Sequence, residues 1–165
     1  MSRMLILLLL AISTLTTHAR LGETESELAK RFGQPTYQQN ENIFAQGQTI
    51  TIGKRQHFQR DNWLIAAIIT EGRCSQISYT HQGDWTETQF ATVLATNCQA
   101  SKWSDTSPAD ANSRKIIRSW KRADGATANW SRPSNSMTVT NPAYLRTREK
   151  AEAKAKANAA RVPKL

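Results

Sequence analysis

The strongest constraint on the fold is an apolar run in the middle of the chain, residues 62–70 (NWLIAAIIT), which is followed at once by a turn signal. A continuous apolar run of this kind, rich in isoleucine, predicts a central strand that is buried on both faces. Glu71 and Gly72 form the turn, and residues 74–80 (CSQISYT) then alternate as the returning strand. The sequence therefore predicts an antiparallel hairpin at the centre of a sheet.

Further strand segments lie on both sides of this hairpin. Residues 48–52 (QTITI) alternate between polar and apolar side chains. Residues 116–121 pair naturally with residues 126–131 across an Asp-Gly pair, which is a strong hairpin signal. Residues 137–140 are expected to add a further short strand.

A well-marked helix precedes each group of strands. In the first, Thr24 is a good N-cap and Glu27 completes a capping box, while Leu28 and Phe32 lie four residues apart on one face. Gly33 can close this helix in a left-handed conformation.

The second helix has the same start signals. Thr86 and Gln89 have capping-box spacing, and Trp85 and Phe90 have the spacing of a hydrophobic staple. The order helix, strands, helix, strands predicts the α+β class, with short helices packed on an antiparallel β-sheet. This order also allows two similar halves, although the identity between them is too low to establish a repeat.

The first residues have the layout of a cleavable export signal. Arg3 supplies a positive charge, residues 4–12 (MLILLLLAI) are apolar, and Thr17 and Ala19 are small residues where a signal-cleaving protease needs them. The apolar run is shorter than the roughly 20 residues of a spanning helix. We therefore expect cleavage of a signal peptide, residues 1–19, and a periplasmic or extracellular protein. Because no cysteine lies near the cleavage point, we expect no lipid anchor.

The predicted mature chain consists of one α+β domain, residues 20–145, and a basic tail, residues 146–165. Removing Arg3 leaves 21 basic against 13 acidic residues, a net charge of +8, to which the tail contributes +5. The tail is rich in alanine and lysine and lacks apolar residues at core spacing after Leu145. We expect it to be a solvated helix or disordered, and dispensable for folding.

Cys74 and Cys98 are the two cysteines of the chain. Two thiols in a small exported domain usually pair in an oxidising compartment, so a disulfide between them is predicted. Two separate buried thiols are the other interpretation.

Parts of the sequence resemble two known groups of proteins. The first helix has the pattern of Gly22, Thr24, Leu28, Phe32, Gly33 and Pro35. This pattern resembles the opening motif of outer-membrane assembly lipoproteins and of β-lactamase-inhibitor-protein-like folds, which implies short helices packed on an antiparallel sheet. The segments LGETE, EGRCSQISY and WKRADG resemble a family of small exported bacterial proteins without an assigned function. The chain lacks the lipid-modified cysteine of the assembly lipoproteins.

Residues that carry chemistry are few. His57 and His81 fit no metal motif, and two cysteines without a C-x-x-C spacing do not form a zinc site. Glu23, Glu25 and Glu27 cluster at a helix N-terminus, where the helix dipole stabilises them. We therefore predict no catalytic, cofactor-binding or metal-binding residues, no cofactor, and no enzyme activity.

Arginine and tryptophan residues interleave on the predicted hairpin near the C-terminus. Arg118, Trp120 and Arg122 share one strand face by the period of two, and Trp130 and Arg132 follow on the partner strand. Such a face is a candidate binding face, because arginine and tryptophan can stack on bases or sugars and bind anionic polymers. The same residues could instead form core and cross-strand pairs.

The sequence favours a non-enzymatic exported protein that contacts another protein in the cell envelope or outside the cell. The alternative is binding of an anionic polymer or a membrane surface through the tail and the arginine–tryptophan face. The globular part carries only +3 of the net charge, so no specific nucleic acid partner is expected.

Overall fold

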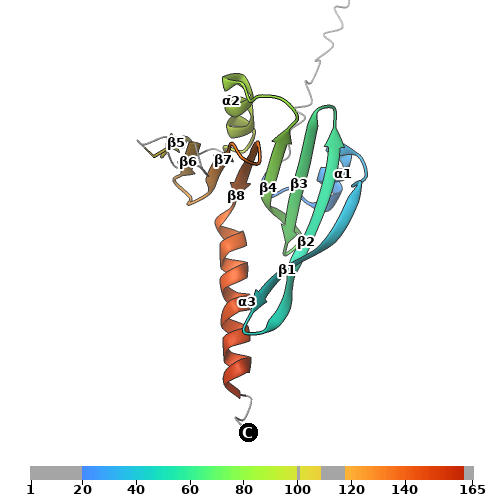
Figure 1. Cartoon of the computed structure of the whole chain (residues 1–165), viewed down its shortest axis with the longest axis vertical. Coiled ribbons are helices and arrows are strands. Elements are labelled where there is room, and N and C mark those ends of the chain that lie inside the picture. The colour runs from blue at the N-terminus through green and yellow to red at the C-terminus, as the bar shows by residue number, and fades with distance from the viewer. Residues whose placement is uncertain (1–19, 100, 109–117, 162–165) are drawn as a thin grey trace, which may run out of the picture.

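The computed structural model describes residues 20–99, 101–108 and 118–161, and within them the chain forms one antiparallel sheet with three helices (Figure 1). The helices are α1 (Glu25–Phe32), α2 (Glu87–Thr96) and α3 (Pro142–Arg161). The strands are β1 (Tyr37–Ala45), β2 (Gln48–Arg60), β3 (Trp63–Thr70), β4 (Arg73–His81), β5 (Trp103–Asp105), β6 (Arg118–Arg122), β7 (Thr127–Ser131) and β8 (Ser136–Thr140). The predicted α+β class is confirmed. The predicted signal peptide, residues 1–19, lies outside the described residues.

The sheet is built from two halves with the same order of elements. Its strand order is β1-β2-β3-β4-β8-β7-β6-β5. Counted over the described residues, each half is a helix followed by four strands, and the halves meet at β4 and β8. Ile77 of β4 lies opposite Val139 of β8, and neither side chain is exposed. The core therefore continues without a break from one half to the other.

The main core lies between one face of the sheet and the helices α1 and α2. Both helices begin with the capping boxes expected from the sequence, at Thr24 and Thr86. Leu28 and Phe32 turn from α1 into this core, and Phe90 does so from α2. The expected buried pair of the first helix is confirmed, since Leu28 is 0% and Phe32 8% exposed.

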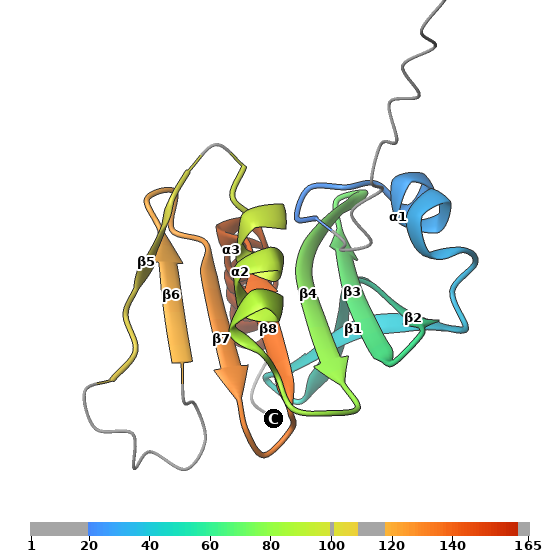
Figure 2. The same ribbon diagram turned by 90° about the horizontal axis from the view of Figure 1, so that it is seen from above.

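Helix α3 lies on the other side of the sheet. Figure 2 shows α2 in front of the sheet and α3 behind it, and Figure 1 shows α3 running beside the β1–β2 hairpin. Tyr144 packs with Ile43, Ile52 and Ile68 in a second, smaller core, and its hydroxyl lies 3.1 Å from Glu41 Oε1.

Of the two alternatives expected for the tail, a solvated helix or a disordered segment, the structure has a helix, but this helix packs on the sheet. The proposed boundary at residue 145 falls inside α3, which begins at Pro142. Ala155, well into the predicted tail, is only 1% exposed. Small alanine side chains let this helix approach the sheet closely, so the tail packs without the large apolar residues that a core stripe usually shows. Residues 162–165 lie outside the described chain.

No helix among residues 20–99, 101–108 and 118–161 is long and apolar enough to cross a membrane.

Candidate functional site

The arginine–tryptophan residues lie mostly on the covered side of the sheet. Arg118, Trp120 and Arg122 do share one face of β6, but α2 packs on that face, and Trp120 is 5% and Arg122 1% exposed. The Arg118 guanidinium lies 4.7 Å from the Phe90 ring centre and 4.9 Å from that of Trp120, and it pairs with Glu87 of α2. These contacts are those of the core and cross-strand pairs that the sequence also allowed, in a packed interface between α2 and the sheet.

Two further residues of the predicted binding face, Arg122 and Trp130, also make contacts within the fold. Arg122 pairs with Asp124 at 2.5 Å and lies over the Trp103 ring, and this pairing holds the pKa of the Asp124 carboxyl below its usual range. Trp130 lies opposite Arg118 and packs on the core beside Phe90. Arg132 is exposed beyond the end of β7.

The predicted disulfide is not formed in this structure, where Cys74 and Cys98 are both free thiols. The backbone of residues 21–23 provides the physical reason. Gly22 N–H donates to the Cys74 carbonyl at 2.7 Å, whereas Leu21 N–H donates to the side chain of Asn97, next to Cys98. This segment is therefore bonded on one side to β4 and on the other to the end of α2. Burial raises the pKa of the Cys74 thiol, so it is a poor nucleophile.

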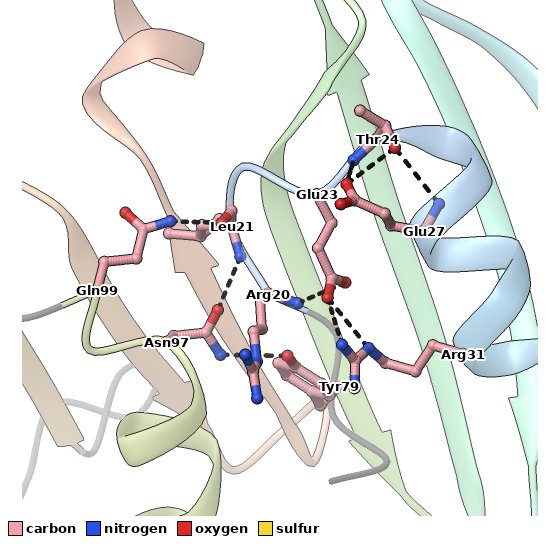
Figure 3. A network of polar contacts seen from close by, with 9 residues as sticks. All are labelled: Arg20, Leu21, Glu23, Thr24, Glu27, Arg31, Tyr79, Asn97 and Gln99. Carbon is pink, nitrogen blue, oxygen red and sulfur yellow. Dashed lines mark hydrogen bonds and ion pairs between the residues drawn. The ribbon is translucent and has the colours of Figure 1, made fainter. Parts of the chain in front are cut away.

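A network of polar contacts surrounds this N-terminal segment (Figure 3). Asn97 is fully buried, and besides accepting from Leu21 N–H it donates to the Tyr79 hydroxyl at 3.2 Å. Gln99 donates from its amide nitrogen to the Leu21 carbonyl. Burial raises the pKa of Tyr79, which keeps its hydroxyl protonated. The network joins the N-terminal segment to both halves of the fold.

The three glutamates of the first helix region have separate partners. Glu23 pairs with Arg31 at 2.5 Å, and Glu25 lies 3.3 Å from Lys54. Glu27 accepts the backbone N–H of Thr24 at 2.7 Å, and this hydrogen bond lowers the pKa of its carboxyl. A groove of about 660 Å³ opens beside the segment; its lining residues are Arg20, Leu21, Gly22, Glu23, Glu27, Lys30, Arg31, Arg73 and Gln99.

The two described histidines lie apart from this groove. His57 lies with its ring 5.6 Å from that of Tyr37, and burial lowers the pKa of its imidazole. The His81 ring lies 4.5 Å from that of Trp63. Within the described residues no group of three or more His, Cys, Asp and Glu is arranged to hold a metal ion.

A polar band lies on the sheet face opposite α1 and α2. We call it the polar face and define it by short uncharged side chains of four neighbouring strands: Ser78 and Thr80, Ser136 and Thr138, Asn129 and Ser131, and Ser119. These residues are half-buried, whereas Tyr79, Ala128 and Met137, which point to the core side, are 0–1% exposed.

The side chains of the polar face are arranged in cross-strand pairs. Ser78 Oγ lies 2.8 Å from Thr138 Oγ1, and the Ser119 hydroxyl donates to Asn129 Oδ1 at 2.8 Å. Among the described helices, α1 and α2 pack on the other face and α3 contacts chiefly β1 to β4. The sequence carried a signal for this surface, because serine and threonine alternate with apolar residues along 74–80 and 137–140.

These features define an α+β protein whose sheet, within the described residues, has α1 and α2 on one face and α3 together with the polar face on the other. Neither a family model nor a curated protein matches the chain. Among solved structures, it is similar to a cysteine-rich secretory protein from Staphylococcus aureus subsp. aureus Mu50, with a TM-score of 0.41 and 12% identity. The match covers 76% of this chain and 46% of that one, so it spans less than half of that protein. The similarity is distant, to a secreted bacterial protein, and assigns no family.

Proposed function

We propose that the protein is an exported, non-enzymatic binding protein, cleaved after Ala19, that contacts another protein in the cell envelope or outside the cell. The polar face is its contact surface. The observation that carries this proposal is the difference between the two sides of the sheet. One side carries α1 and α2, whereas the other carries α3 over β1 to β4 and, beside it, a band of small uncharged side chains.

The chemistry of the polar face suits a protein partner. An antiparallel sheet can leave side chains of one face in water, so the polar face is stable without a partner. Hydroxyl and amide groups offer donors and acceptors to a docking chain, and their short side chains lose little conformational entropy on binding. Beside the uncharged band, the exposed Lys121 follows Ser119 on β6 with the period of two and adds a positive charge to the same sheet face.

A photo-crosslinking experiment in the exporting cell tests the contact surface. A crosslinking residue is placed at Asn129 on the polar face and, as a control, at Thr88 on the exposed side of α2. We expect an adduct with one envelope or extracellular protein from Asn129 and not from Thr88. With that protein purified, Ser131→Arg should weaken binding at least about tenfold, the equivalent of 1.4 kcal/mol, and Thr88→Arg should not. Equal adducts from both positions would contradict the proposal.

A second candidate function, binding of an anionic polymer or membrane surface, is favoured by α3. Arg146, Lys150 and Lys154 are four residues apart and exposed, so they form one basic stripe along this helix. Changing all three to Gln should lower the salt concentration that elutes the protein from anionic vesicles. The control removes the same charge elsewhere, at the exposed Lys30, Lys102 and Lys121. If both triple variants elute alike, only net charge matters and the stripe is not a site.

A further inference from the structure

The chain is held in the fold right up to the residue at which cleavage is proposed. Leu21 is 2% exposed and belongs to the main core. Gly22 and Glu23 exchange backbone hydrogen bonds of 2.7 Å with Cys74 on β4, and the Arg73 guanidinium donates to the Gly22 carbonyl at 3.0 Å. The backbone that follows Arg20 therefore has little freedom.

This fixed backbone places the nitrogen of Arg20 against a carboxylate. The Arg20 backbone nitrogen lies 3.1 Å from Glu23 Oε2, while Glu23 Oε1 lies 2.5 Å from the Arg31 guanidinium (Figure 3). The Glu23 side chain is 11% exposed, so the carboxylate is largely shielded from water, whereas Arg20 is exposed. A carboxylate has two oxygens and about four acceptor positions, enough for both partners.

We propose that Glu23 is the binding site for the α-ammonium group that cleavage after Ala19 leaves on Arg20. The inference rests on the export and processing proposed above. In that cleavage, water adds across the peptide bond, so that Ala19 leaves with a carboxylate and Arg20 keeps an amine that takes up a proton. A neutral amide donor beside Glu23 thereby becomes a cation with three donors, and the hydrogen bond becomes charge-assisted.

Several other charged groups lie near this site and also affect the pKa of an amine there. Those facing the groove are Arg20, Glu27, Lys30 and Arg31 from the N-terminal segment and α1, and Arg73 from β4. Burial raises the pKa of Cys74 and of Tyr79, and the nearby Glu23 charge acts on each in the same direction. Of the two carboxylates, Glu27 is engaged with Thr24, which leaves Glu23 as the partner of the new terminus.

Cleavage then does more than release the protein from its signal peptide. The ion pair exists only in the processed chain, because an uncleaved chain has an amide at residue 20. It fastens the new terminus to the segment that connects β4, α1 and the end of α2. Removal of the signal peptide is in this way coupled to the stability of the folded domain.

The test measures the α-amine of the exported protein directly. The protein is purified from its compartment, and the rate at which acetic anhydride modifies the N-terminus is followed by mass spectrometry against pH. An ordinary α-amine has a pKa of about 7.7–8.0, and a nearby opposite charge raises it by about 1 unit or more. At pH 7 the folded protein should therefore react about tenfold more slowly than the same protein in urea.

Two variants of equal charge separate the roles of the carboxylates. Glu23→Gln should return the folded protein to the faster rate, and Glu27→Gln, in the same groove, should leave the slow rate unchanged. Equal rates for the folded and the unfolded parent would overturn the inference even if Glu23→Gln failed to fold. A chain that starts at Arg20 but has an ordinary amine overturns only this inference. A mature chain that starts elsewhere overturns the proposed processing as well.

Discussion

Single side chains hold this fold through contacts between elements that are far apart in sequence. Phe32 at the end of α1 meets Phe58 of β2 with ring centres 5.4 Å apart. Asn97 is fully buried, yet its polar atoms are used by Leu21 and Tyr79. A buried amide costs stability unless it is paired, so this residue specifies how α2 and the N-terminal segment meet.

At this scale, replacing Phe32 by Ala should destabilise the protein by about 3–5 kcal/mol, because it removes a large core side chain and leaves a cavity. Phe44→Ala is the matched control, since Phe44 is 77% exposed and Phe32 8%. Denaturant unfolding measures both. A Phe32→Ala midpoint as high as that of Phe44→Ala would mean that α1 is not packed as described.

The two thiols should differ in reactivity. Cys74 is buried and its thiol pKa is raised, so little thiolate forms at neutral pH, whereas Cys98 is half-buried. Iodoacetamide should label Cys98 of the folded protein well before Cys74, and both should be labelled in urea without a reductant. Site-resolved mass spectrometry distinguishes them. If no thiol is labelled in urea, the cysteines are paired after all.

At the scale of elements, the capped helices could be predicted from sequence and the edge strands could not. Thr24 and Thr86 bond to backbone groups three residues away, so their capping boxes can be recognised from the local sequence. By contrast, β1 has the polar sequence YQQNENIFA, and it forms because β2 offers it a partner. Strand preference depends on such context. The three-residue β5 likewise exists through its pairing with β6.

The candidate binding surfaces could likewise be predicted only in part from the sequence. The period of two correctly placed Arg118, Trp120 and Arg122 on one face, but not which face the second helix would cover. That choice depends on Phe90 and Val93 of α2, whose buried positions are tertiary contacts. The close contact between Arg20 and Glu23 also depends on β4, which fixes the segment between them.

Helix α3 provides a test of how a helix rich in alanine docks. Ala155 is 1% exposed, whereas Ala153 is exposed. An Ala→Glu substitution at each position therefore makes the same chemical change once at a buried site and once at an exposed site. Ala155→Glu should cost about 1–3 kcal/mol, because it desolvates a charge or displaces the helix. Ala153→Glu should cost less than about 0.5 kcal/mol. Denaturant midpoints and hydrogen exchange along α3 report both, and equal effects would restore the view of a solvated tail.

At the scale of the whole molecule, the two halves share one core instead of packing as separate domains. The strands β4 and β8 hydrogen-bond along five residue pairs, from Gln76 with Thr140 to Thr80 with Ser136. The N-terminal segment of the first half is also bonded to Asn97 in the second. An unfolded second half would expose the apolar side chains of β4 and leave its edge unpaired.

The two halves should therefore unfold together. Val139→Ala in β8 and Ile65→Val in β3 should each lower the midpoint of a single unfolding transition of the whole domain, because both side chains belong to the same core. The expected cost is about 0.5–1.5 kcal/mol for Ile65→Val, which removes one buried carbon, and about twice as much for Val139→Ala, which removes two. Hydrogen exchange checks this at single amides. In the parent, the slowest amides of β3 and of β7 should have the same free energy of opening, and within each variant this free energy should fall by the same amount in both strands. A variant that weakens only the strands of its own half would show two units that fold independently, with β4 and β8 forming an interface between them.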